Sequence, residues 1–437
     1  MTKNKQVRNL AYLLADQLLR LILALLLDVL IARNLEPSEY GIYSYAISLN
    51  MIFWRLAALG LDGLLLRELS TNTDSWASIL KTALIMRILA SCLCAIIPCT
   101  ISWLLNDSKM SFAVVASGSI SIVFVFADAI NCYFQATMQN IAAAILRSCA
   151  YVLAFSLAIF MLFRDEPVYW IAFSISCYLP IVFVFYSLLI GKCKWIQIFK
   201  SKFSLENAKY LLSLAWPLVV ASLGVVAFNR LGIVMVKQMC SPVEAANFAI
   251  ATRITEVWQL IPNMLLTVFL PRLSNEFKNQ TSEFKQNISG IILLVISIAL
   301  IITIFLILFA ETLIVTLFGD KYLDAVMLVR IQSASVFFSF ISVIYSKLIV
   351  ISSVTFFSLL RQLIGGLSIV LFNFFSIPLF GPSGASIAVV LGYVVATIIV
   401  AAFYPKARWM NYSLYYAIKN PNQSLKVLLN YINERPS

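Results

Sequence analysis

Long runs of apolar residues recur along the whole chain, and prolines, glycines or small clusters of charge separate them. A helix needs about 20 consecutive apolar residues to cross the hydrocarbon core of a bilayer. The stretches 167–191 and 288–310 reach that length without one charged residue. Dividing the chain at its polar interruptions predicts twelve spans, at residues 10–32, 41–66, 79–104, 111–138, 142–163, 168–190, 208–236, 244–270, 288–317, 325–350, 355–377 and 384–404.

The composition agrees with this pattern. Apolar residues make up 61% of the chain and charged residues 12%, against roughly 45–50% and 25% in ordinary soluble domains. A soluble globular protein is therefore excluded. The longest gap between predicted spans, 191–207, is too short for a folded domain with its own core. We expect an all-α integral membrane protein whose function is carried out within the membrane.

Lysine and arginine are divided unevenly between the two ends of the predicted spans. Cytoplasmic loops of membrane proteins carry an excess of these residues. With the N-terminus inside, 21 of the 32 cations fall on the inner side, 5 on the outer side and 6 within spans. This division predicts an even number of spans with both termini in the cytoplasm. The six intramembrane cations are all arginines, namely Arg20, Arg55, Arg87, Arg230, Arg253 and Arg330.

Several kinds of chemistry are excluded or disfavoured by residue type. The chain has no histidine, so a histidine-based catalyst or proton relay is excluded. Its eight cysteines are scattered without a CxxC pair, which is typical of small buried apolar residues rather than zinc ligands. We expect no catalytic activity, no metal, no bound cofactor and no nucleic acid as a partner.

Two segments resemble each other at an offset of 205 residues. LEPSEYGIYSYAIS starts at Leu35 and CSPVEAANFAIATR starts at Cys240, so that Pro37, Glu39 and Arg67 fall opposite Pro242, Glu244 and Arg272. Six spans per half is an even number, which gives the halves the same orientation and relates them by an axis along the membrane normal. The expected organisation is an N-terminal lobe (1–194), a cytoplasmic amphipathic linker (195–207), a C-terminal lobe (208–405) and a cytoplasmic tail (406–437).

Polar residues form stripes on several predicted spans. An arginine near the centre of a bilayer costs about 2.5–3.5 kcal/mol, so it should face a wet cavity or a partner. Arg20 shares the first span with Asp16 and Asp28, and Arg55 shares the second with Ser44, Ser48 and Asp62. Arg253 lies beside the 4, 3, 4 series Thr252, Glu256, Gln259 and Asn263. The alternative is an internal salt bridge within each span.

Two further stripes lack a central cation. Their members are Ser117, Ser121, Asp128, Gln135 and Gln139 in the fourth span, and Gln332, Ser335, Ser339, Ser342 and Ser346 in the tenth. Neutral hydrogen-bonding groups suit a sugar, and they also suit helix packing in lipid. Both interpretations remain open from the sequence.

Four segments in a fixed order resemble one family of transporters. They include RNLEPSEYGIYSYAISL, EAANFAIATRITEVWQLIPNMLLTVFLPRLS, LFGDKYLDAVMLVRI and PLFGPSGASIAVVLGYVVAT. Together they resemble the polysaccharide-exporter branch of the multidrug/oligosaccharidyl-lipid/polysaccharide (MOP) superfamily. Within that branch the chain looks most like an O-antigen flippase for lipid-linked repeat units.

The resemblance implies two lobes of six helices that open a central cavity alternately to each side. The cargo it implies is an undecaprenyl-diphosphate-linked oligosaccharide, carried to the periplasmic leaflet of the bacterial inner membrane. Related lipid II flippases use arginines of the first, second and eighth helices for the diphosphate, and the matching positions are Arg20, Arg55 and Arg253. Arg230 joins this candidate set, although local pairing or snorkelling is the alternative for Arg230, Arg87 and Arg330.

The driving force and two competing functions stay open. Moving about two negative charges outward across an inside-negative membrane gains roughly 4–5 kcal/mol at 100 mV. The membrane potential alone is therefore one candidate driving force. Seven residues are instead candidates for facing the sugar or for coupling H⁺ or Na⁺, namely Asp16, Asp28, Asp62, Asp128, Glu256, Gln135 and Asn263.

A cation or drug antiporter of the same superfamily should have an acidic cavity. A repeat-unit polymerase or membrane glycosyltransferase should have a large periplasmic loop.

Overall fold

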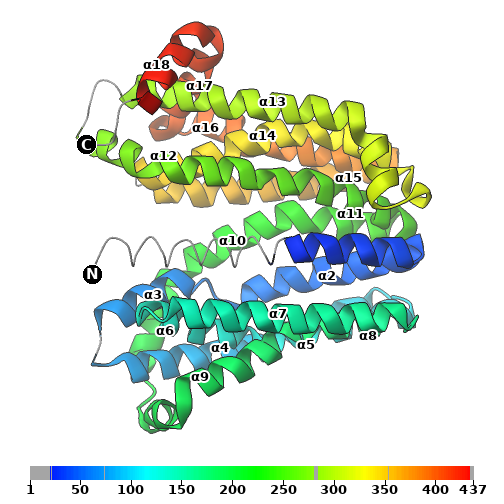
Figure 1. The fold of residues 1–437 in the computed structure, drawn as a ribbon, viewed down its shortest axis with the longest axis vertical. Helices are drawn as coiled ribbons and strands as arrows, with labels where there is room; N and C mark the ends of the chain where they lie inside the picture. The colour runs from blue at the N-terminus through cyan, green and yellow to red at the C-terminus, as the bar shows by residue number, and fades with distance from the viewer. Residues whose placement is uncertain (1–19, 21, 73, 280–283, 353, 434–437) are drawn as a thin grey trace. The chain divides into compact units, whose positions relative to one another are not determined.

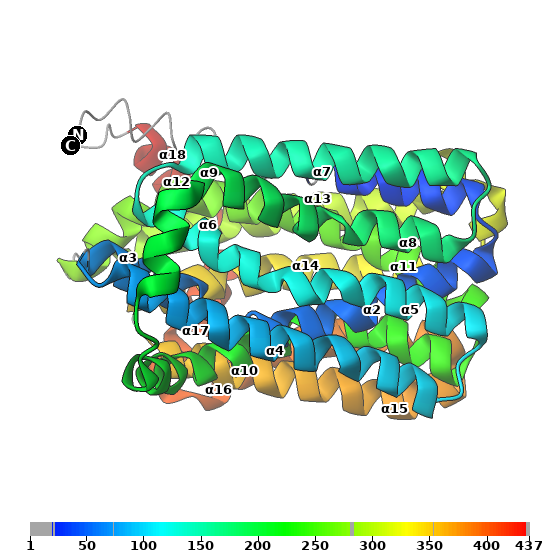
Figure 2. The same cartoon turned by 90° about the horizontal axis from the view of Figure 1, so that it is seen from below.

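A computed structural model describes residues 20, 22–72, 74–279, 284–352 and 354–433. Asp16 lies outside these residues. The described chain is all helical, as the sequence predicts, and it divides into two compact units, Met1–Val226 and Ala227–Ser437. The division falls within one long helix, α10 (Leu205–Met239), rather than in the 195–207 segment. Figures 1 and 2 show that the long helices of each unit lie side by side.

The first unit begins with a helix described over 22–34. Its other helices are α2 (Pro37–Ala57), α3 (Asp62–Thr71), α4 (Trp76–Leu104), α5 (Lys109–Val123), α6 (Ala127–Ala136), α7 (Asn140–Phe163), α8 (Val168–Ser176), α9 (Tyr178–Lys200) and the first part of α10.

The second unit begins within α10. It continues with α11 (Pro242–Glu256), α12 (Leu260–Lys278), α13 (Phe284–Leu317), α14 (Ala325–Ser352), α15 (Thr355–Val394), α16 (Val400–Phe403), α17 (Arg408–Lys419) and α18 (Pro421–Asn433). A five-residue π-helix, Val395–Ile399, lies between α15 and α16.

The described part of each predicted span is mainly helical, and a turn at 58–61 divides the second span between α2 and α3. Nine helical segments of the described chain are long and apolar enough to cross a membrane. One of them, Phe356–Phe403, contains the eleventh and twelfth predicted spans, which a kink at Gly381 separates (φ 58°, ψ −141°). The predicted eighth span corresponds to α11 and α12 with a short 3₁₀ turn between them. The chain is therefore a multi-pass helical membrane protein.

The internal repeat has a local structural cause. Pro37 and Pro242 are the first residues of α2 and α11, where the missing N–H costs nothing. Glu39 accepts a hydrogen bond from the backbone N–H of Glu36 at 3.4 Å, and the backbone N–H of Glu244 donates to Ser241 Oγ at 3.2 Å. The repeated Pro-x-Glu is thus the first turn of two equivalent helices.

The segment predicted as a linker is helical up to Lys200. Gly191 has a left-handed conformation (φ 75°) that breaks α9 and turns the last part of the helix. Ile198 is then buried in the first unit, and Trp195 packs beside it. Phe199 is 71% exposed, so the segment has one buried and one open face.

The two halves of α15 pack closely on both sides of Gly381. Ser376 Oγ donates to the carbonyl oxygen of Gly384 at 3.0 Å. A Cβ at Gly384 would collide with the backbone carbonyl of Ser376, whereas one at Gly63 in α3 would meet nothing within 4 Å. Gly384 therefore permits the close approach of the two halves.

We predict that Gly384→Ala lowers the stability of the purified protein by about 1–3 kcal/mol, because an overpacked site must displace backbone. The measurement is the apparent melting temperature in detergent. Gly63→Ala is the matched control and should leave it unchanged or slightly higher, since alanine favours helix more than glycine. Equal melting temperatures for the two variants would contradict the packing interpretation.

Candidate functional site

Three of the predicted polar-site acids are ion-paired with arginines of other helices. Each carboxylate lies on one helix and its guanidinium on another, at nitrogen to oxygen distances of 2.6 Å for Arg87–Asp62, 2.7 Å for Arg147–Asp128 and 3.2 Å for Arg230–Glu256. Glu256 thus pairs with the preceding helix α10. These contacts neutralise both charges within the lobe.

Arg87 is the most deeply buried of these arginines. Its side chain has no exposed surface, and Asp62, which is 56% exposed, is its acidic partner. Local pairing, rather than snorkelling, is therefore the structural role of Arg87. A guanidinium in this position needs a counter-charge because an unpaired buried ion is strongly destabilising.

The charge count from the sequence places Arg147 among the cations of the inner side, but the structure buries its side chain among helices. Its side chain is only 21% exposed, and it pairs with Asp128. Its Nε also donates to Tyr178 Oη at 2.8 Å. The residue lies two turns inside α7, where it faces α6 and α9 rather than the end of the helix.

Arg361 is also one of the 21 cations that the charge count places on the inner side, and it too is buried. It is 1% exposed within α15. Its guanidinium donates to the carbonyl and hydroxyl of Ser342, at 3.1 and 2.9 Å, and to Ser346 Oγ at 2.6 Å. Part of the serine stripe of the tenth span therefore holds an arginine. Two intramembrane arginines, Arg147 and Arg361, were missed from the sequence.

Arg55 differs from these buried arginines. Its side chain is exposed, and its guanidinium lies over the ring of Trp54, 4.8 Å from the centroid. Within the described part of the chain no carboxylate pairs with it. A cation on an aromatic face keeps its hydrogen-bond donors available for a ligand.

The other predicted site residues have varied surroundings. Arg20, Arg253 and Gln135 are half-buried and Asp28 is buried. Asn263 is exposed and donates to the carbonyl of Gln259 at 2.9 Å. Because Arg20 and Arg55 belong to one unit and Arg253 to the other, their joint action on one ligand stays a prediction.

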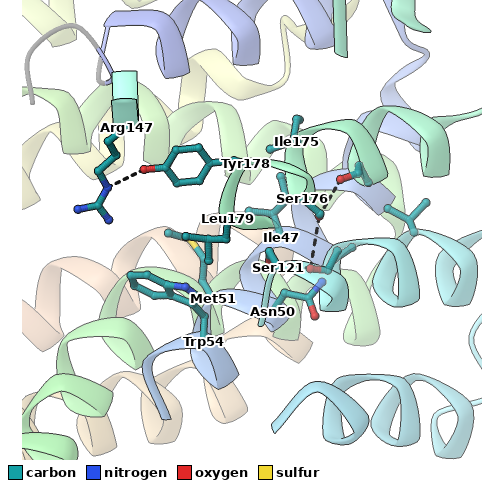
Figure 3. A pocket seen from close by; sticks show the side chains of 14 residues that line it. Ile47, Asn50, Met51, Trp54, Ser121, Arg147, Ile175, Ser176, Tyr178 and Leu179 are labelled. Atoms are coloured by element: carbon teal, nitrogen blue, oxygen red, sulfur yellow. Dashed lines mark hydrogen bonds between the residues drawn. The ribbon is translucent and has the colours of Figure 1, made fainter. Parts of the chain in front are cut away.

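The first unit contains a cavity of about 250 Å³. Its walls come from α2, α5, α7, α8 and α9, and apolar side chains dominate them (Figure 3): Ile47, Met51, Trp54, Ile175 and Leu179. Arg147 contributes the charged group, and Tyr178, Ser121 and Ser176 contribute hydroxyl groups. A largely apolar guest with a few polar contacts suits this lining. Periodicity on single helices did not indicate the cavity, because five helices build it.

The second unit contains a small polar cavity of about 20 Å³, enough for one water molecule. Glu256, Gln259, Gln332, Ser335 and Tyr393 line it. Gln259 Nε2 donates to Tyr393 Oη at 3.0 Å. Among the residues described, no three histidine, cysteine, aspartate or glutamate side chains gather as metal ligands.

Comparison with solved structures defines the class of protein. The lipid II flippase MurJ in an inward closed conformation is 15% identical, with 98% of this chain and 94% of that chain covered and a TM-score of 0.70. An inward-facing MATE family multidrug resistance transporter of the MOP superfamily is 13% identical, with 92% and 96% covered and a TM-score of 0.68. A MOP superfamily transporter from Pyrococcus furiosus Vc1 is 14% identical, with 95% and 96% covered and a TM-score of 0.56. The chain has the MOP transporter fold.

The sequence family is narrower than the fold. A sequence model of the family described as polysaccharide biosynthesis protein matches residues 6–277, which is more than half of the chain. The chain belongs to this family, as the resemblance predicted, and its fold is that of the MOP superfamily structures. No curated protein sequence matches it. The protein is therefore a multi-pass helical membrane protein of the polysaccharide biosynthesis family, with the fold of MOP superfamily transporters.

We predict that Asp62→Asn lowers the apparent melting temperature, because it leaves buried Arg87 without its counter-charge. Asp74→Asn is the matched control at an exposed acid and should have no effect. The double variant Asp62→Asn with Arg87→Met should recover most of the loss, since it removes both charges. Failure of the double variant to recover would show that the ion pair is not the cause.

Proposed function

We propose that the chain is a flippase for undecaprenyl-diphosphate-linked oligosaccharide repeat units, either O-antigen or another surface polysaccharide. It moves them from the cytoplasmic to the periplasmic leaflet of a bacterial inner membrane by alternating access. Membership of the polysaccharide biosynthesis family supports the glycan part of this proposal. Likeness in fold to a protein named as a lipid II flippase supports the lipid-linked part.

The observation that carries the proposal is the exposed guanidinium of Arg55. Arg87, Arg147 and Arg230 are each neutralised by an acid of the same lobe, whereas no acid among the described residues pairs with Arg55. A diphosphate offers several acceptor oxygens, and a guanidinium offers paired donors in a fixed plane that match them. In this proposal Arg55 binds the diphosphate, and Arg20 and Arg253 add further donors.

The ion pairs also bear on the driving force. A proton or Na⁺ that bound Asp62, Asp128 or Glu256 would compete with the guanidinium that each carboxylate already holds. Displacing it would leave a buried cation unpaired, which is costly. We therefore favour the membrane potential as the drive, because it acts directly on the negative charge of the cargo.

The same pairs disfavour the competing functions. An exporter of cationic drugs needs acids that are available to the drug, and three of the predicted acids are occupied. A repeat-unit polymerase or glycosyltransferase needs catalytic groups outside the membrane. Each predicted outer loop is about ten residues or shorter, which is too short for a folded catalytic domain outside the membrane.

We predict that Arg55→Ala abolishes surface glycan when the variant is the only copy of the gene in its own host, because the diphosphate loses its donor. Arg55→Lys should restore part of the activity, since a lysine keeps the charge without the paired donors. The measurement is surface glycan per cell, normalised to the protein present in the membrane.

Arg330→Ala is the matched control, because Arg330 is also an exposed arginine within a long apolar helix. It should leave surface glycan at the level of the unmodified protein. Normal glycan with Arg55→Ala would contradict the role of Arg55. Equal loss with both variants would show that any exposed arginine of a span is required, and would also contradict it.

A further inference from the structure

The C-terminal helices α17 and α18 form a hairpin that is fastened to the second unit. Figure 1 shows the hairpin beside the N-terminal part of α13, and the two helices contact α13 directly. A Cβ at Gly290 of α13 would lie 2.9 Å from the carbonyl oxygen of Ser424, so the backbones approach closely. Ser424 Oγ also donates to Ser289 Oγ at 3.4 Å.

An arginine at the end of α12 holds the last turns of the hairpin. Arg272 donates from Nη1 to the carbonyl of Tyr431 at 2.6 Å, and its guanidinium lies 3.7 Å from the centroid of the Tyr431 ring. A second contact fixes the first helix, where Asn411 of α17 donates to the carbonyl of Ile398 and accepts from Tyr345 Oη. The hairpin is therefore a docked element rather than a loose tail.

The length of α13 places the hairpin relative to the bilayer. At about 1.5 Å per residue its 34 residues extend roughly 50 Å, against about 30 Å for the hydrocarbon core. Side chains between Leu300 and Leu308 of α13 are largely exposed, as expected for contact with lipid tails, whereas Ile288, Ile291 and Ile292 are buried. A helix of this length projects beyond the core, and the hairpin covers its N-terminal end, away from the exposed apolar residues.

The open surface of the hairpin combines aromatic, aliphatic and basic residues. Arg408, Tyr412, Tyr415 and Lys419 follow a 4, 3, 4 spacing on α17, and all are exposed. On α18, Leu425, Lys426 and Leu429 are exposed as well. Residues 404–433 contain four cations and no acid. Apolar side chains beside lysine and arginine are typical of helices that lie in a membrane interface.

We propose that this hairpin surface binds the anionic headgroups of the surrounding bilayer. Its tyrosines and leucines enter the boundary between headgroups and tails, and Arg408, Lys419 and Lys426 contact lipid phosphates. Because Arg272 joins the hairpin to α12, bound anionic lipid also braces the end of that helix. The proposal does not depend on which cargo the protein moves.

Hydrogen exchange on the full chain tests this proposal. The protein is placed in nanodiscs of phosphatidylcholine alone and of phosphatidylcholine with phosphatidylglycerol. Amide exchange in residues 408–429 should slow roughly tenfold or more in the anionic bilayer, since each cation near such a surface contributes about fivefold to binding. Exchange in the core of α13 should be the same in both bilayers.

The triple variant Arg408→Gln, Lys419→Gln and Lys426→Gln should lose this dependence on lipid charge. The matched control is Lys109→Gln, Arg164→Gln and Lys321→Gln, which removes three exposed cations elsewhere and should retain it. Equal exchange of the hairpin in both bilayers would overturn the proposal. So would a lipid dependence that survives in the first triple variant.

Discussion

An arginine within a bilayer must be neutralised, hydrogen-bonded or reach water, and this constraint organises the structure. Arg87, Arg147 and Arg230 meet it through acids of neighbouring helices. Arg361 meets it through serine oxygens alone. These contacts hold helices together inside each lobe. Arg55 meets the constraint because its side chain is exposed. The paired or hydrogen-bonded arginines are therefore structural, whereas Arg55 is a candidate for binding a ligand.

The fold followed from apolar periodicity because each span is long compared with its connections. The sequence also located the internal repeat, whose Pro37 and Pro242 proved to begin equivalent helices. It could not distinguish a buried cation near the start of a span from one in a loop. Arg147 and Arg361 both lie within about two turns of a helix start, and only the packing of neighbouring helices decides which way they face.

The candidate site was predicted less well for a related reason. A stripe on one helix shows which residues share a face, but it does not show their partner. Asp62, Asp128 and Glu256 share faces with polar neighbours, yet each is paired with an arginine of a different helix. The apolar cavity bounded by Trp54 and Leu179 depends on five helices at once, so no single periodic pattern contains it. Arg55 entered the candidate set through the resemblance to lipid II flippases, and its role in binding stays a prediction.

The central claim is that the protein recognises the diphosphate of a lipid-linked glycan. The most direct measurement is translocation in proteoliposomes, read as the accessibility of the sugar to a membrane-impermeant lectin. Undecaprenyl-diphosphate-linked oligosaccharide is compared with the same oligosaccharide on undecaprenol without phosphate. The account predicts that an outward-positive potential moves the first rapidly and the second at the rate of protein-free liposomes. Equal movement of both lipids would contradict it.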